Sequence, residues 1–391
     1  MAEHAVGVVG LGGLGSAAAY WLARDGVDVV GFEQFELGHV RGASHDHSRI
    51  IRRSYHTPGY VALTAEAYAA WEHVERDAGT ELVTRTGGID LFPPGAAIDP
   101  EPYLSSMTAC GVPYEWLDAG EVRRRWPAFD RGTIVGGDVM AIYSEATGIV
   151  PAGRGTATLQ ELATGHGAEL RPHTPVLELR PTADGEVDVV TEHGPVRCGS
   201  VVVCADAWTN RLLAPLGAQI PLAVTREQVT YLPSDDLDDL QPGRFPVWIW
   251  MDDPSYYGFP VYGRLDSAKA AEDCGGAEVD ADTRTFEPDR RMEAELAAFM
   301  AGLVGDRFGA PQSTTCLYTL TSDRDFVADR VPEHPQISVG LGAAHGFKFA
   351  AWFGRTLAEL ATGAGPGPEL APFGFARDTL HEPIDRAAWL V

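Results

Sequence analysis

A chain of 391 residues, of which 45% are hydrophobic, is long enough for two domains, or for one large discontinuous domain, with a substantial core. Its net charge of -25 repels phosphate backbones and anionic lipid headgroups, which argues against nucleic acid or a membrane as a partner. The five cysteines are scattered without paired metal spacing, so the composition favours neither a disulfide framework nor a metal site.

The N-terminal sequence, MAEHAVGVVGLGG, lacks the basic leader and the apolar core of a signal peptide. No apolar run in the chain approaches the roughly 20 residues that a membrane span needs. We therefore expect a cytoplasmic protein.

The segment that ends at Glu33 predicts a strand, a glycine turn, a helix and a second strand, written AVGVV, GLGGLG, SAAAYWLARDG and VDVVGFE. Gly10, Gly12 and Gly15 form the pattern G-x-G-x-x-G in this context, and Glu33 follows Gly15 by 18 residues. The glycines allow backbone N–H groups to approach a pyrophosphate, and Glu33 suits the ribose hydroxyls of FAD or NAD. The alternative is a glycine-rich turn that binds nothing.

A basic loop follows at residues 39–55, HVRGASHDHSRIIRRSY. In so acidic a chain, its arginines and histidines indicate an anionic or electron-rich partner, whereas the alternative is a solvated start of a helix.

The rest of the chain predicts an α/β domain with an inserted lobe. TGIVPAGRGTATLQELATGHGAEL predicts a helix followed by strands, and RCGSVVVCADAW predicts a strand buried on both faces. Between about residues 221 and 310, REQVTYL, VWIWM and YYGFPVYG predict the strands of an antiparallel lobe. The chain closes on a strand, a glycine turn and a helix in ISVGLGAAHGFKFAAWFGRTLAELATG.

Lysine is rare in this chain, because only Lys269 and Lys348 among the 30 basic residues are lysines. A compositional preference for arginine is the simplest explanation. The motifs around the two lysines favour another.

Six segments in order carry a resemblance: GLGGLG with Glu33, SHDHSRIIR, TGIVPAG, YYGFP followed by Lys269, TCLYTLTSD and HGFKF. Together they resemble the monomeric sarcosine oxidase and N-methyltryptophan oxidase group of FAD-dependent amine oxidases, within the glycine and D-amino-acid oxidase superfamily. The resemblance implies a monomer with an α/β (α+β) fold. A discontinuous, Rossmann-like FAD-binding domain would comprise residues 1–85, 145–220 and 311–391. An antiparallel-sheet substrate domain would comprise residues 86–144 and 221–310.

The resemblance also implies roles for single residues. Lys269 would promote the reaction of reduced flavin with O2, since a compact ammonium stabilises superoxide. Arg52 and Lys348 would hold the carboxylate of an amino-acid substrate. Cys316 would join the 8α carbon of the flavin through a thioether, beside His45 and Arg49, whose positive charge is expected to lower the thiol pKa.

Further contacts follow from the same resemblance. Tyr257 and Tyr318 match pocket positions, and Trp248 or Trp250, which share one face of a strand, would enclose the substrate if they are not simply core. The cofactor contacts would also include Ser44, Ser48, Val176, His345, Gly346, Phe347 and Lys348.

Three departures leave the substrate open. The family's histidine after the lysine is replaced by the acidic pair Glu272 and Asp273, which puts sarcosine in question. Asp206 stands where a glycine is usual, and Ala343-Ala344 replaces a serine-glycine pair.

The favoured function is oxidation of an N-methyl amino acid, or of a cyclic imino acid such as proline or pipecolate. Hydride transfer from the carbon next to a neutral amine to the flavin would give an imine, and O2 would be reduced to H2O2. An alternative flavoenzyme of the same fold would oxidise an amine or imine of specialised metabolism. A third hypothesis is a nucleotide-binding protein without catalysis.

Overall fold

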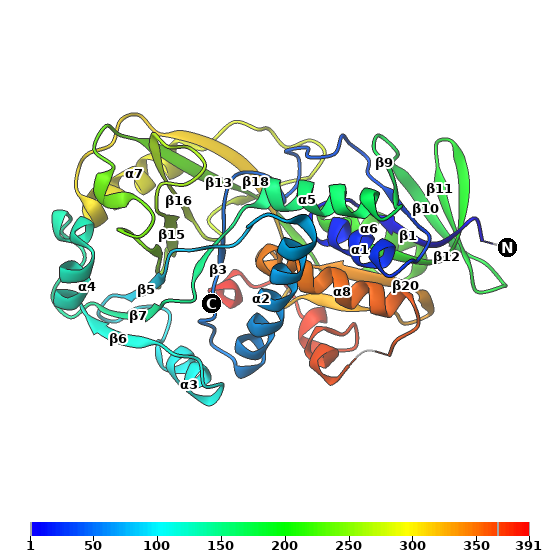
Figure 1. The fold of residues 1–391 in the computed structure, drawn as a ribbon, viewed down its shortest axis with the longest axis horizontal. Coiled ribbons are helices and arrows are strands. Elements are labelled where there is room, and N and C mark those ends of the chain that lie inside the picture. The colour runs from blue at the N-terminus through cyan, green and yellow to red at the C-terminus, as the bar shows by residue number, and fades with distance from the viewer. Residues whose placement is uncertain (1, 366, 391) are drawn as a thin grey trace.

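Two large β-sheets organise the chain, and most of the helices lie between and beside them (Figure 1). The computed structural model describes residues 2–365 and 367–390. One sheet lies at the end of the molecule that carries the N-terminus, and α4 (Ala119–Arg125) and α7 (Arg290–Val304) lie at the opposite end (Figure 1).

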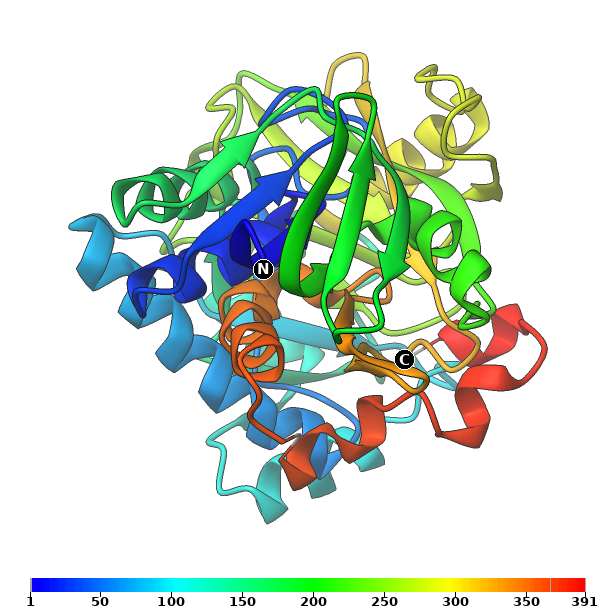
Figure 2. The same cartoon turned by 90° about the vertical axis from the view of Figure 1, so that its right-hand side faces the viewer.

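The first sheet has eight strands and includes both strands of the predicted glycine motif. They are β1 (His4–Val9), β2 (Val29–Phe32), β9 (Glu169–Arg171), β10 (Val176–Pro181), β11 (Val187–Thr191), β12 (Gly194–Val203), β19 (Val327–Val331) and β20 (His334–Leu341). β1 pairs in parallel with β2 and with β12, and β12 pairs in parallel with β20. The apolar runs predicted as buried strands therefore form the centre of this sheet. The antiparallel edge formed by β10, β11 and β12 faces the viewer in Figure 2.

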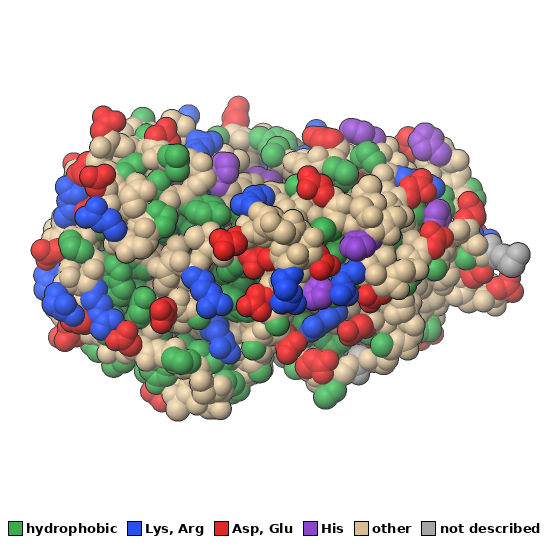
Figure 3. All heavy atoms as spheres, in the orientation of Figure 1, with side chains coloured by type: hydrophobic (Ala, Val, Ile, Leu, Met, Phe, Trp, Pro, Cys, Tyr) green, Lys and Arg blue, Asp and Glu red, His purple; other side chains and the backbone are tan. Residues whose placement is uncertain are grey.

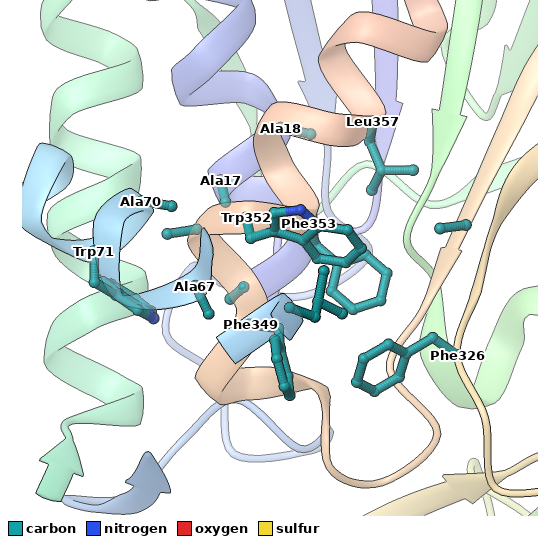
Figure 4. Packing of buried hydrophobic residues seen from close by; sticks show 14 of the residues in the cluster. Ala17, Ala18, Ala67, Ala70, Trp71, Phe326, Phe349, Trp352, Phe353 and Leu357 are labelled. Carbon is teal, nitrogen blue, oxygen red and sulfur yellow. The ribbon is translucent and has the colours of Figure 1, made fainter. Parts of the chain in front are cut away.

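The helix that follows the glycine turn packs closely on the last long helix of the chain. The remaining helices are α1 (Gly13–Arg24), α2 (Pro58–Ala78), α3 (Glu101–Ala109), α5 (Ala152–Gly165), α6 (Thr209–Leu213) and α8 (Ala350–Ala361). Figure 4 shows Ala17 and Ala18 of α1 beside the aromatic side chains of α8. A Cβ atom added to Gly354 of α8 would lie 2.4 Å from the Cβ of Ala17, so the absence of a side chain at Gly354 allows the two helices to approach this closely.

The second sheet has nine strands and forms the predicted lobe. They are β5 (Gly88–Phe92), β6 (Glu115–Asp118), β7 (Met140–Ser144), β13 (Ala223–Pro233), β14 (Val247–Trp250), β15 (Tyr256–Phe259), β16 (Ser267–Glu272), β17 (Ala277–Glu278) and β18 (Gln312–Leu320). Its pairings are antiparallel, apart from the parallel pair of β5 and β14. The mixed α/β fold is thus confirmed. The assignment of segments to domains stays a prediction, and β18 departs from it because it pairs with β13 although it follows residue 311.

A small sheet of β3 (Arg49–Ile51), β8 (Gly148–Val150) and β4 (Thr84–Arg85) ties the basic loop to the TGIVPAG segment. On the face shown in Figure 3, acidic side chains are spread among basic ones. Within the described ranges, no helix combines the length and the apolar character needed to cross a membrane.

Candidate active site

The glycine turn after β1 has a backbone that only glycine fits without strain. Gly10 has φ +88°, and an added Cβ would lie 2.4 Å from the carbonyl oxygen of Cys204. A Cβ on Gly15 would lie 1.8 Å from the carbonyl oxygen of Gly10. The N–H of Gly13, at the first turn of α1, donates to Ser44 Oγ at 2.9 Å. The turn therefore brings backbone N–H groups to the helix start, where an anion is stabilised.

Glu33 follows β2 and fixes the glycine turn through its carboxylate. Oε2 accepts the N–H of Leu11 at 2.9 Å, and Oε1 accepts the N–H of Phe35 at 3.1 Å. Burial by itself would raise the pKa of Glu33, but hydrogen bonds from His39 and from the Leu11 amide outweigh it and lower the pKa. Glu33 is thus an ionised acceptor in the wall of the cavity that begins at this turn.

A cavity of about 480 Å³ connects the glycine turn with the aromatic and basic residues of the second sheet. Of the residues expected in the site, it is lined by Gly10, Gly12, Glu33, Ser44, Arg49, Arg52, Val176, Tyr257, Tyr318, His345, Gly346, Phe347 and Lys348. The others, Gly15, His45, Ser48, Trp248, Lys269 and Cys316, are not among the lining residues.

The register of the second sheet explains which of its side chains reach the cavity. Ile249 of β14 pairs with Asp90 of β5 and with Tyr257 of β15. Side chains at paired positions share a face, so these three residues point to the same side of the sheet. In the same way, Cys316 pairs with Glu227 and Tyr318 with Thr225.

Trp248 and Trp250 face the other way. Both flank Ile249 in the strand, and both pack against Phe299 of α7 at ring-centroid distances of 5.9 and 5.6 Å. The expectation that one of them encloses the substrate is corrected: they share a face, as predicted, but that face belongs to the core under α7, and Ile249 lines the cavity in their place.

Two cations meet at the aromatic end of the cavity around Tyr55. The guanidinium carbon of Arg52 lies 4.9 Å from the Tyr55 ring centroid, and Lys348 Nζ lies 5.8 Å from it. The buried NH1 atom of Arg52 lies 3.6 Å from Asp90 Oδ1 in an ion pair and makes no hydrogen bond. Lys348 lies in the 3₁₀ helix Gly346–Phe349 and donates to the carbonyl oxygen of His345 at 3.1 Å.

Lys348 lacks a counter-ion. Over residues 2–365 and 367–390, no carboxylate pairs with it. Burial lowers the pKa of Lys348 well below its usual value, and Arg52 and Arg324 lower it further. A bound anion would remove this penalty.

A third buried cation at this end was not anticipated from the sequence. Arg324 has φ +59°, lines the cavity and donates to Asp273 Oδ2 at 2.7 Å. It also donates to the carbonyl oxygen of Trp389, near the C-terminus. Asp273, one of the acidic residues that replace the expected histidine, is therefore held at the cavity by an ion pair. A signal was present in the TLTSDRD segment, but the partner lies 51 residues away in the sequence.

Cys316 is buried, and its environment differs from the expectation. Arg49 does lower the pKa of the thiol, but burial is the larger effect and raises it to about 11. His45 is neutral near pH 7, because burial and then Arg49 lower its pKa to about 4. Its Nε2 is buried without a partner.

Lys269 is 2% exposed and lies behind the cavity wall. Its Nζ forms an ion pair with Asp46 and donates to Ser48. Burial lowers the pKa of Lys269 to about 8, although Asp46 opposes the shift.

Asp206 lines the cavity next to the glycine turn with φ +45°. Its Oδ2 is buried without a hydrogen-bond partner. Burial raises the pKa of the carboxyl to about 6.

Comparisons with known proteins agree on one family. A family model described as FAD dependent oxidoreductase matches residues 5–360. Monomeric sarcosine oxidase of Streptomyces avermitilis is 36% identical over 364 residues, which cover 90% of this chain and 92% of that protein. N-methyl-L-tryptophan oxidase of Yersinia pestis is 27% identical, with 95% and 98% covered. The structure of NikD, described as an unusual amino acid oxidase essential for nikkomycin biosynthesis, superposes with a TM-score of 0.83 at 26% identity, with 96% and 98% covered.

We predict that Asp206→Asn stabilises the protein in a pH-dependent way. Because the folded pKa of about 6 lies above the ordinary value of 3.8, wild type loses stability relative to the variant as the pH rises through this range. The gain should reach roughly 1 to 3 kcal/mol above pH 7 and should disappear near pH 4, apart from a pH-independent contribution of Asn at positive φ. Thermal unfolding of both proteins between pH 4 and pH 8 measures it, and a gain independent of pH would contradict the buried-charge explanation.

Proposed function

The chain belongs to the FAD dependent oxidoreductase family as an FAD-dependent amine oxidase of the sarcosine oxidase group, and we propose that Arg52 and Lys348 bind the carboxylate of its substrate. Oxidation of secondary or cyclic amino acids is the activity that this membership supports. The substrate class is an N-methyl amino acid or a cyclic imino acid.

The residues present fit FAD. The cavity begins at a glycine turn that leaves no room for a Cβ, beside a helix start without acidic side chains in its first turn. Glu33 supplies an ionised acceptor for ribose hydroxyls, and the first amides of α1 suit the pyrophosphate. Arg49, which lines the cavity, would lie beside the ring system, and His45, whose buried Nε2 has no partner, lies outside the lining. When bound, FAD supplies the hydride acceptor.

The observation that carries the proposal is the surplus of buried positive charge around Tyr55. Arg52 NH1 lies 3.6 Å from Asp90 without making a hydrogen bond, and Lys348 has no counter-ion within the described residues. A buried ammonium without an anion is costly, so a carboxylate that contacts both side chains restores the balance. Arg52 offers a planar fork and Lys348 a point charge, which together orient the substrate.

The aromatic wall offers two phenol hydroxyls to the substrate amine. The hydroxyls of Tyr257 and Tyr318 lie 3.5 Å apart, and burial raises the pKa of both, so they stay neutral. Since an ammonium has no free lone pair, the substrate reacts as the neutral amine, and Tyr257 and Tyr318 can donate hydrogen bonds or accept them.

A second candidate is the oxidation of an amine or imine of specialised metabolism. It is favoured by the likeness to NikD and by Asp273, which stands where the family's histidine is expected. A carboxylate fixed by Arg324 would select a substrate with a hydrogen-bond donor at that position.

Two finer assignments concern O2 and the flavin linkage. Lys269 is the cation that stabilises superoxide, the first product when O2 accepts an electron, and it is supported by a fixed, water-poor environment. Cys316 is the attachment point for the flavin. Because its pKa is about 11 in the protein alone, we infer that the thiolate forms only after FAD has bound.

For Arg52→Ala, the expected result is a fall in kcat/KM of roughly 10²-fold or more, about 3 kcal/mol, for a substrate with a carboxylate such as L-proline. Pyrrolidine, which lacks the carboxylate, should lose much less. Arg53→Ala is the matched control, since the Arg53 side chain donates to Thr64 rather than lining the cavity. An equal loss for both amines would exclude the carboxylate clamp.

For Lys269→Met, reduction by substrate should change little, while the reaction of the reduced enzyme with O2 should slow by roughly 10² to 10³-fold. Stopped-flow mixing of anaerobically reduced enzyme with oxygenated buffer measures the rate. Arg264→Met, which removes a less buried cation stacked on Tyr231, is the control. An unchanged rate would sink the oxygen assignment.

The linkage is tested by precipitating the purified holoenzyme with acid. The yellow colour should stay in the washed pellet of wild type and of Cys274→Ser, and should move to the supernatant for Cys316→Ser. Colour in the wild-type supernatant would mean that FAD is bound without a covalent bond.

A further inference from the structure

Asp46 lies against Lys269 in the interior of the protein. The Oδ2 atom of Asp46 is 2.6 Å from Lys269 Nζ, and the two side chains are 8% and 2% exposed. Asp46 belongs to the basic loop before β3, and Lys269 belongs to β16. Neither residue lines the cavity, so the ion pair is enclosed by protein on this side of the sheet.

The ammonium group of Lys269 is held by three polar contacts. Besides Asp46, Nζ donates to Ser48 Oγ at 2.9 Å and to the carbonyl oxygen of Ser48 at 3.1 Å. Two of the three ammonium protons are thus donated to Ser48, and the ion pair with Asp46 is the third contact. The nitrogen therefore has a fixed position.

Asp46 has a backbone conformation that residues other than glycine seldom adopt. Its φ is +78°, which costs energy for a residue other than glycine. Its carbonyl oxygen accepts the N–H of Gly153 at 2.9 Å, and its Oδ1 accepts the hydroxyl of Tyr231 at 2.6 Å. Contacts on both sides thus keep the carboxylate aimed at Lys269.

We infer that Asp46 is a positioning residue for the oxygen step: its carboxylate fixes the Lys269 ammonium and keeps that nitrogen positively charged inside the protein. The inference rests on the proposed role of Lys269. O2 takes up two electrons from the reduced cofactor and two protons to become H2O2, and only a charged lysine stabilises the superoxide formed by the first electron.

The surroundings explain why Lys269 needs this partner. Burial and Arg49 both lower the pKa of Lys269, and Asp46 is the largest influence in the other direction. The other groups near the ammonium carry no charge near pH 7: His45 and Cys316 have pKa values of about 4 and 11, and Tyr231 and Phe259 present ring faces. Without Asp46, the nearest charge on the described residues around Lys269 would be the repelling one of Arg49. A buried lysine in that situation titrates several pH units below its usual value.

The first test observes the lysine directly in the purified holoenzyme. With ¹³C at the lysine Cε atoms, the chain gives two side-chain signals, from Lys269 and Lys348, and Lys269→Met identifies which is which. The signal of Lys269 should titrate near pH 8 in wild type and at least one pH unit lower in Asp46→Asn. Asp239→Asn, which breaks an ion pair with Arg131 and Arg307 away from the cavity, should leave it unchanged. An unchanged titration in Asp46→Asn overturns the inference.

The second test measures the oxygen reaction of dithionite-reduced enzyme between pH 6 and pH 9, without any substrate. The wild-type rate should fall as the pH rises through the pKa of Lys269, since the charged form is the active one. In Asp46→Asn the fall should occur at lower pH. At a pH above both pKa values, the variant should be about tenfold slower than wild type if its lysine titrates one pH unit lower, and it should approach wild type at pH 6. A variant as fast as wild type at every pH, or faster, would show that Asp46 does not support the lysine.

These outcomes distinguish a failure of the proposed role of Lys269 from a failure of the inferred role of Asp46. If Lys269→Met reacts normally with O2, the proposed role of Lys269 fails, and with it the oxygen part of this inference. If Lys269→Met is slow and Asp46→Asn behaves as wild type, only the role of Asp46 fails. Should Asp46→Asn lose FAD, Asp46→Gly takes its place, because glycine adopts φ +78° readily.

Discussion

The central constraint on this protein is the cost of burying cations beside a cavity. Among the described residues near the cavity, Lys269 pairs with Asp46, Arg324 with Asp273 and Arg52 with Asp90, whereas Arg49 forms no ion pair. Lys348 has none among the described residues. An unpaired buried charge is tolerated where a ligand supplies the missing counter-charge, and this imbalance is the basis of the proposal that the substrate carboxylate binds at Lys348.

The fold brings these charges together from segments far apart in the sequence. Arg52 and Asp46 belong to the basic loop, Asp90 to β5, Lys269 to β16 and Lys348 to the 3₁₀ helix before α8. The register of the second sheet turns Asp90, Ile249 and Tyr257 to one face, and the cavity connects that face with the glycine turn of the first sheet. One elongated cavity can therefore hold a dinucleotide at one end and an amino acid at the other.

The elements that could be predicted are those with a strong local signal. The strand, glycine turn and helix at the N-terminus were predictable because only glycine fits the contacts of Gly10 and Gly15. The antiparallel lobe followed from its strand pattern, and most of the residues named from the resemblance of six separated motifs line the cavity. The place of Trp248 could not be predicted, because its spacing from Trp250 fixes that the two share a face but not which face α7 covers.

The sequence by itself determined the family and the dinucleotide-binding turn, and it singled out Lys269 and Lys348 as candidate site residues. Each of these depends on residue types within a short segment. Only the tertiary structure decided the partners of those lysines. A counter-ion is set by distance in space, and Asp46 and Lys269 come from distant parts of the chain but lie 2.6 Å apart in the fold. The same holds for burial, which raises the pKa of Cys316 against the effect of a neighbouring arginine. Ion pairing and desolvation depend on how several elements pack together, and this packing cannot be predicted from a short segment of sequence.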